Sequence, residues 1–307
     1  MEAVPAIIGP TASGKTTLAI HLAKKINGEI IGLDSRQIYK DISIGTAQPN
    51  PSEKKTIKHH LIGVKPINET INAGEYAKLV VRCIEKIKLK NKIPIICGGS
   101  GLYFRAISKG IFESSRSELD VRKKLELKYE NEGGVRMLDR LKELDYEYSK
   151  HIHANNKKRL VRALEIFETT GKTPSVHFAE QKKNSAPVPN LFSIYLKWDR
   201  GEIEERIAER TSKMLKDGWV EEVRKLKNNY PNLNLHPLDS IGYSQIMRFL
   251  NGEITIRELE NKINTKTRQF AIKQIKWFKK EEIDLKIKMN PNINLSQIVE
   301  KISTSLN

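Results

Sequence analysis

Residues 9–16 read GPTASGKT and fit the phosphate-binding pattern G-x-x-x-x-G-K-[ST]. The pattern follows an apolar segment, residues 4–9, that has the composition of a buried strand. It opens residues 16–26, whose apolar positions recur with helical spacing. Because a true P-loop joins a strand to a helix, both contextual conditions are met.

The residue types in this pattern suit a diphosphate or a triphosphate. Gly9 and Gly14 let backbone N–H groups turn inward, where they and the positive end of the helix bind phosphate oxygens. Lys15 adds a full charge, and the Thr16 hydroxyl can ligate Mg²⁺ together with phosphate oxygens and water. The motif does not say that the ligand is a nucleotide. The predicted phosphate-binding residues are Gly9, Pro10, Thr11, Ala12, Ser13, Gly14, Lys15 and Thr16.

A carboxylate, Asp34, ends the second apolar segment at residues 29–34. Ligands of doubly wound sheets collect at the carboxyl ends of the strands, so we expect Asp34 beside the phosphate site. There it could bind a water of a Mg²⁺ ion, as in kinases, or act as a general base; a helix-capping or loop aspartate is the plain alternative. The following Arg36, Gln37 and Tyr39 can hydrogen-bond or stack on bases, which favours a planar, polar acceptor.

The remaining pattern predicts an α/β fold. Apolar segments at residues 4–9, 29–34 and 93–98, separated by helical segments, indicate a parallel sheet covered on both faces, a P-loop core like that of nucleoside kinases. Charged helical runs then replace the strand signals, a strand returns at residues 191–198, and Asp199 with Glu202 resembles a capping box. The C-terminal third is mostly helical, most strongly at residues 255–281. The predicted domains are a core of residues 1–111 and 190–307 and an all-helical insertion of residues 112–189.

Composition bears on the partner. The 307 residues carry a net charge of +17, which suggests nucleic acid first and an anionic membrane surface second; lysines on solvated helix faces are the plain alternative. Both cysteines, Cys83 and Cys97, lie in apolar stretches and are expected in the core, without a disulfide or a cysteine metal site. The N-terminus lacks the features of a signal peptide, and no segment has about 18 consecutive apolar residues. We expect a cytoplasmic protein that binds no membrane.

Several blocks resemble those of the tRNA dimethylallyltransferases, also called tRNA isopentenyltransferases, over nearly the whole chain. They are GPTASGKT at 9–16, DSRQIYK at 34–40, IGTAQP at 44–49, HHL at 59–61, GGSGLYF at 98–104, KRLVRALEI at 158–166 and TRQFAIKQIKWF at 267–278. A P-loop alone is shared by many enzymes. Its combination with DSRQIY and the arginine-rich segment is far more specific.

The resemblance implies transfer of a dimethylallyl group from dimethylallyl diphosphate to N6 of the adenine 3′-adjacent to the anticodon of tRNA. Asp34 would take the amine proton, while Thr16 with Mg²⁺, Lys15 and the loop amides hold the diphosphate. Arg210 matches a family arginine near the departing diphosphate. The positions that match tRNA contacts are Asp34, Ser35, Arg36, Gln37, Ser100, Arg122, Lys158, Arg159, Leu160, Val161 and Arg162. We expect a monomer that binds the anticodon stem-loop.

The chain departs from the family pattern at three places. Ser100 replaces the usual Thr and keeps the hydroxyl. Asn156-Lys157 replaces an Asp-Pro pair, so the start of that helix could differ. The segment around Gly242-Tyr243 lacks its usual basic residues, and we therefore leave it out of the predicted site.

Other features and functions stay open. Core packing is the better interpretation of Trp198, whereas the lysines around Trp277 make either a solvated helix or one that follows the RNA backbone possible. The alternatives to a tRNA prenyltransferase are an adenylate isopentenyltransferase acting on free AMP, ADP or ATP, a small-molecule kinase, and a non-catalytic RNA-binding P-loop protein.

Overall fold

The computed structural model describes residues 3–110, 118–183, 188–231 and 236–306. Contacts divide the chain into two compact units, Met1–Lys109 with Pro189–Asn307, and Gly110–Val188. The expected boundary at residues 111 and 112 lies outside the described residues, and the division into functional domains stays a prediction. No helix of the described chain is long and apolar enough to cross a bilayer.

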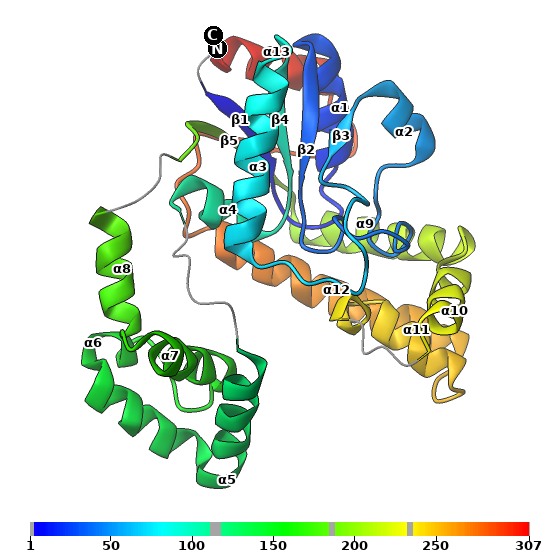
Figure 1. The fold of residues 1–307 in the computed structure, drawn as a ribbon. Helices are drawn as coiled ribbons and strands as arrows, with labels where there is room; N and C mark the ends of the chain where they lie inside the picture. The colour runs from blue at the N-terminus through cyan, green and yellow to red at the C-terminus, as the bar shows by residue number, and fades with distance from the viewer. Residues whose placement is uncertain (1–2, 111–117, 184–187, 232–235, 307) are drawn as a thin grey trace. The chain divides into compact units, whose positions relative to one another are not determined.

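The larger unit is built on a six-stranded sheet of order β3-β2-β4-β1-β5-β6, with every pair parallel. The expected α/β class is confirmed (Figure 1). The pattern missed the two-residue edge strand β3 and the four-residue strand β6. The strands are β1 (Val4–Ile8), β2 (Gly28–Leu33), β3 (His59–His60), β4 (Ile93–Gly98), β5 (Leu191–Lys197) and β6 (Leu285–Lys288).

Successive strand residues point to opposite faces, and each face has its own core. Ala6 and Ile8 of β1 pack in one cluster and Ile7 in the other. One face holds α1 (Lys15–Lys25), α9 (Arg200–Lys216) and α13 (Leu295–Leu306). The other holds α3 (Ala73–Lys88), α4 (Gly101–Ser108), α10 (Trp219–Asn229), α11 (Tyr243–Leu250) and α12 (Ile256–Phe278). The short helix α2 (Pro51–Thr56) precedes β3.

Local sequence sets several helix starts. Asn72 with Glu75 caps α3, and Thr255 with Glu258 caps α12, in capping boxes that satisfy otherwise unpaired N–H groups. The capping box expected for Asp199 and Glu202 is wrong, because the Asp199 side chain accepts no bond from the first turn of α9. Its carboxylate instead lies 3.4 Å from Nζ of Lys288 on the unpredicted strand β6.

The smaller unit is helical, as far as it is described. It comprises α5 (Leu119–Leu144), α6 (Tyr146–Ser149), α7 (Lys157–Thr170) and α8 (Pro174–Lys183). Gly133, with φ of 82°, breaks the helical geometry within α5. Asn156 accepts a hydrogen bond from the Arg159 N–H, so the departure from the family's Asp-Pro pair still yields a capped α7. The core of the smaller unit lies between α5 and α7 and includes Leu141 and Leu164.

Truncating Leu164 to Ala is expected to lower the free energy of unfolding by about 2–5 kcal/mol, since its fully buried side chain would leave a cavity. Urea unfolding followed by circular dichroism measures the effect. Leu127→Ala is the matched control, because Leu127 is 63% exposed on α5. Equal stability of the two variants would contradict a separate core in this unit.

Candidate active site

The P-loop between β1 and α1 has the expected cradle geometry. Ala12 and Gly14 have φ of 61° and 84°, left-handed values that curl the loop around its own N–H groups. Gly14 is the N-cap of α1 and has no side chain that could cap the helix, so the first helical N–H groups are available to an anion. Lys15 Nζ donates to the Pro10 carbonyl at 2.6 Å.

Residues far along the chain hold this loop from outside. The Trp198 indole N–H donates to the Ser13 carbonyl at 2.9 Å, and Arg206 Nε donates to the Ala12 carbonyl at 2.8 Å. The Arg206 guanidinium also lies 4.3 Å from the Trp198 ring centroid. Trp198 is buried, as expected, but its contribution includes shaping the loop as well as packing.

The charges around the loop are coupled. Burial lowers the pKa of Lys15 to about 8, Arg210 adds to the decrease, and Asp34 opposes it. Burial likewise lowers the pKa of Arg210, and Asp34 raises it. The buried Cys97 has a pKa of about 11, so it is a neutral thiol beside Lys15. A dianionic ligand would relieve the crowding of Lys15 and Arg210.

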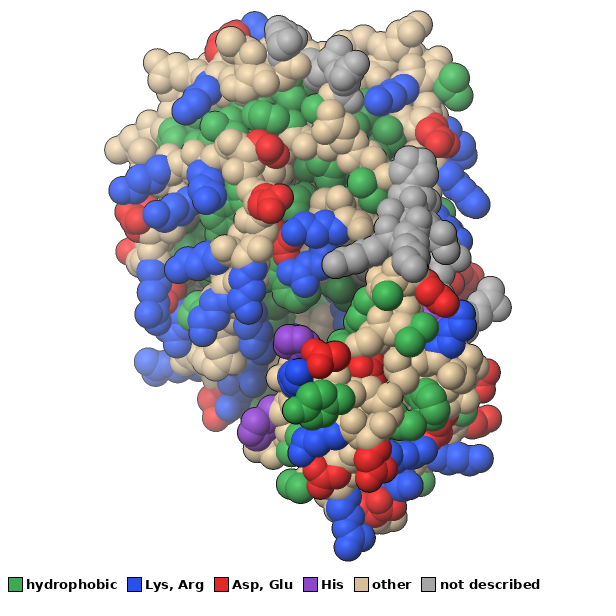
Figure 2. All heavy atoms as spheres, turned by 90° about the vertical axis from the view of Figure 1, so that its left-hand side faces the viewer, with side chains coloured by type: hydrophobic (Ala, Val, Ile, Leu, Met, Phe, Trp, Pro, Cys, Tyr) green, Lys and Arg blue, Asp and Glu red, His purple; other side chains and the backbone are tan. Residues whose placement is uncertain are grey.

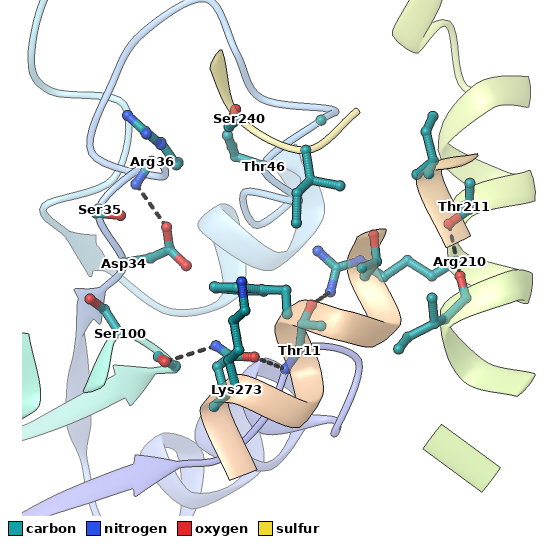
Figure 3. Close-up of a pocket in the computed structure, with 18 of the residues that line it drawn as sticks. Thr11, Asp34, Ser35, Arg36, Thr46, Ser100, Arg210, Thr211, Ser240 and Lys273 are labelled. Atoms are coloured by element: carbon teal, nitrogen blue, oxygen red, sulfur yellow. Dashed lines mark hydrogen bonds between the residues drawn. The ribbon is translucent and has the colours of Figure 1, made fainter. Parts of the chain in front are cut away.

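Asp34 follows β2 directly and begins a turn. Its Oδ1 accepts hydrogen bonds from the N–H groups of Arg36 at 2.8 Å and Gln37 at 3.3 Å. These bonds orient the carboxylate, and Figure 3 shows Asp34 pointing into a cavity that Lys273 also enters. The bonds to Oδ1 come from backbone groups, so an amide at position 34 could keep the same turn.

Two cavities meet beside Asp34. The first, of about 480 Å³, is lined by Asp34, Ser35, Arg36 and Ser100 and is called the acceptor cavity below. The second, of about 770 Å³, is lined by the P-loop from Thr11 to Thr16 and is called the phosphate cavity. Residues that line both are Thr11, Asp34, Thr46, Gly99, Arg210, Met214, Phe270 and Gln274. Asp34 and Lys15 therefore line the same cavity, as expected from the sequence.

A wall of the acceptor cavity comes from α12, which contributed no residue to the predicted site. Its contributing side chains recur at helical spacing and so share one face of the helix. They are Ile263, Thr267, Phe270, Lys273, Gln274 and Trp277. This helical spacing is the sequence signal that could have identified α12 as a wall of the cavity. Trp277, left open above, lines the cavity with the Arg105 guanidinium 4.5 Å from its ring centroid.

Another wall is the loop after Ile42, which Glu222 of α10 holds. The Glu222 carboxylate accepts the N–H groups of Ile44 at 2.7 Å and Gly45 at 3.0 Å, and the Tyr243 hydroxyl at 2.7 Å. Gly45 must be glycine, since a Cβ there would overlap Trp219 and Tyr243. Gln37 supports the same loop by donating to the carbonyls of Thr46 and Ala47.

The segment around Gly242 also reaches the site, although we left it out of the predicted residues. Asp239, Ser240 and Ile241 line the acceptor cavity. Gly242, with φ of 90°, begins α11 directly after them. The missing basic residues therefore change the chemistry of this wall, while the segment still contributes to it.

The remaining tRNA-contact predictions fall on the helical unit. Lys158 and Arg159 are exposed on α7, whereas Leu160 and Val161 are buried in the core of this unit at 0% and 2% exposure. This burial excludes RNA contacts of the Leu160 and Val161 side chains, so any contact at these two positions would have to come from backbone atoms. The other two predicted residues are paired, Arg122 with Glu126 and Arg162 with Glu165.

The residues of the phosphate cavity fit a magnesium ion that arrives with phosphate ligands. Thr16 and Asp34 supply hard oxygen atoms in the same cavity. Within the described ranges no three His, Cys, Asp or Glu side chains gather to hold a metal. Mg²⁺ commonly takes one or two protein ligands and completes its shell with phosphate and water, which matches this donor set.

The fold and the joined cavities define a P-loop α/β transferase, with a phosphate cradle at one end and a carboxylate beside a partly apolar acceptor cavity at the other. Residues 37–281 match the family model described as IPP transferase. A tRNA dimethylallyltransferase from Acetivibrio thermocellus is 40% identical over 92% of this chain and 90% of its own length. The chain belongs to the IPP transferase, or tRNA dimethylallyltransferase, family.

Solved structures agree with this assignment. The full-length tRNA isopentenylpyrophosphate transferase from Bacillus halodurans is 30% identical, with a TM-score of 0.72, and the match covers 100% of this chain and 96% of that one. A eukaryotic dimethylallyltransferase described as acting on tRNA has a TM-score of 0.84 at 27% identity. Its match covers 100% of this chain and 79% of the other.

The lowered pKa of Lys15 predicts pH-dependent donor binding. In the free protein Lys15 loses its charge as pH rises through about 8, whereas the Cys97 thiol stays neutral. Since the anion prefers protonated Lys15, the Kd of dimethylallyl diphosphate at saturating Mg²⁺ should rise about eightfold between pH 7.5 and 9. Isothermal titration calorimetry measures it. Lys15→Met should bind more weakly and without this rise; a parallel rise in that variant would contradict the assignment to Lys15.

Proposed function

We propose that this chain transfers a dimethylallyl group from dimethylallyl diphosphate to the exocyclic N6 amine of the adenine 3′-adjacent to the anticodon in tRNA. The observation that carries the proposal is the junction of the two cavities at Thr11, Asp34 and Arg210. A donor held by its diphosphate in the P-loop would extend its allylic carbon toward Asp34. The apolar Met214 and Phe270 at the junction suit a branched hydrocarbon.

In the proposed reaction two bonds form and two break, and the proton that leaves N6 forms an O–H bond with the Asp34 carboxylate. The N6 nitrogen bonds to the allylic carbon, the carbon–oxygen bond to diphosphate breaks, and an N6 proton passes to the Asp34 carboxylate. An adenine amine is a poor nucleophile because its lone pair is delocalised, so a positioned base helps as bonding develops. The adenine must leave its stack to reach this carboxylate, which makes base flipping part of the proposal.

Departure of the diphosphate builds negative charge in the phosphate cavity. Lys15, Arg210 and the P-loop amides are the groups proposed to stabilise this charge, and Arg210 is braced by the hydrogen bond from its Nη1 to Thr11 Oγ1 at 3.0 Å. Mg²⁺ held through Thr16 and the diphosphate would neutralise further charge. No phosphoryl group is transferred in this reaction.

The surface charge supports a nucleic-acid acceptor over free AMP. Figure 2 shows Lys and Arg side chains gathered on one face of the larger unit, and the net charge of the chain is +17. Such a surface binds phosphates of the RNA backbone in a salt-dependent way. The proposed tRNA contacts include Lys158 and Arg159, which are exposed on α7, together with Arg122 and Arg162 of the helical unit. They also include Asp34, Ser35, Arg36 and Ser100 at the acceptor cavity and Gln37 at the phosphate cavity.

The proposal predicts that label moves to RNA. Purified protein with Mg²⁺, tRNA lacking this modification and labelled dimethylallyl diphosphate should give labelled tRNA and intact diphosphate, without ATP hydrolysis. Label on AMP alone would support an adenylate isopentenyltransferase instead. Phosphate transfer from ATP would support a kinase, and either result would overturn the proposal.

Asp34→Asn is expected to lower kcat by about 10²–10⁴-fold, the contribution of a general base, with the Kd for tRNA within about threefold. The Asn amide oxygen can still accept the Arg36 and Gln37 N–H groups, so the turn survives. Single-turnover kinetics and filter binding measure both quantities. Asp199→Asn is the control, since this carboxylate is exposed beside Lys288; an active Asp34→Asn variant would exclude Asp34 as the base.

A further inference from the structure

Gln274 of α12 occupies a buried position between two loops of the site, at 7% exposure. Its Oε1 accepts the Thr11 N–H at 2.8 Å, and its Nε2 donates to the Gly99 carbonyl at 2.8 Å. The two polar atoms of the side-chain amide are therefore each used by a different loop.

The Thr11 bond holds the donor side of the site. Thr11 belongs to the P-loop, and its hydroxyl accepts the hydrogen bond from Arg210. The Gln274 side chain thus holds Thr11, and Thr11 in turn holds Arg210. Arg210 is the arginine proposed to face the departing diphosphate. Thr11 lines both cavities, so a shift of this residue would change the phosphate cavity and its junction together.

The Gly99 bond holds the acceptor side. The Ser100 N–H donates to the Leu33 carbonyl at 3.3 Å, and Leu33 directly precedes Asp34. The space at Gly99 is closed, because a Cβ there would lie 2.5 Å from Gln274 Nε2 and 2.9 Å from the Gly9 carbonyl oxygen. The loop that carries Gly99 and Ser100 is therefore confined between Gln274, β1 and the end of β2.

We propose that Gln274 is a positioning residue that sets the spacing between the diphosphate cradle and Asp34 by clamping Thr11 to Gly99. The inference rests on the proposed prenyl transfer, in which these two sides carry the electrophile and the base. One loop presents an N–H and the other a carbonyl, and a side-chain amide satisfies both. Since a misplacement of about 1 Å can cost about 10²-fold in rate, a clamp of this kind acts on kcat.

Two variants separate this role from substrate binding. Gln274→Leu removes both bonds and is expected to lower kcat about 30- to 100-fold, with donor KM and tRNA Kd changed less than about threefold. Gln274→Glu keeps the acceptor for Thr11, but its ionised form turns an unprotonated oxygen toward the Gly99 carbonyl. A protonated carboxyl restores the donor.

The pH profile is therefore the decisive readout. The kcat of Gln274→Glu relative to wild type should rise at least about fivefold from pH 8 to pH 6, because burial favours the neutral carboxyl. The same ratio for Gln274→Leu should stay flat. Gln297→Leu, an exposed position on α13 outside both cavities, is the matched control and should leave kcat unchanged.

Several outcomes would overturn the inference. A flat ratio for Gln274→Glu, or a raised KM with normal kcat, would exclude the positioning role. If neither variant folds, hydrogen exchange of the wild-type protein decides, since the Thr11 amide must exchange slowly and fast exchange would exclude the clamp. An inactive wild-type protein contradicts the proposed function, whereas an active one with unaffected Gln274 variants contradicts this inference alone.

Discussion

The site depends on the electrostatic attraction of the Asp34 carboxylate for Lys15 and Arg210 at one end of the parallel sheet. Asp34 follows β2 and Lys15 lies in the P-loop after β1, with β4 between the two strands. The carboxylate raises the pKa of Lys15 and Arg210, while burial lowers both. Because parallel strands place their carboxyl ends at the same edge, the fold brings the Asp34 carboxylate and the phosphate cradle together without any long-range loop.

Side chains from the C-terminal half hold the loops that surround this pair. Trp198 and Arg206 bind P-loop carbonyls, Gln274 joins the P-loop to Gly99, and Glu222 binds two N–H groups of the loop at Ile44 and Gly45. Loop backbone groups that lie near a cavity have few partners in the sheet, and an unpaired buried group is costly. The helices α9, α10 and α12 thus satisfy these groups and limit the movement of the loops.

Local patterns predicted the parts of the molecule that depend on neighbouring residues. The apolar runs predicted β1, β2, β4 and β5, and the P-loop motif placed Lys15 and Thr16 correctly at the start of α1. Gln274 and Glu222 escaped because their partners are backbone groups 175 and 177 residues away, which no spacing reveals. The edge strand β6 escaped for a similar reason, since only its pairing with β5 distinguishes four residues from a loop.

The positions of the tryptophans make the intrinsic fluorescence of this protein sensitive to its site. The chain has three tryptophans, at positions 198, 219 and 277, and all belong to the larger unit. Trp198 touches the P-loop, and Trp219 and Trp277 line the acceptor cavity. Emission excited at the indole band therefore reports on the immediate surroundings of the two cavities, with no background from residues 110–188. Native fluorescence can follow occupancy of either cavity without an attached dye.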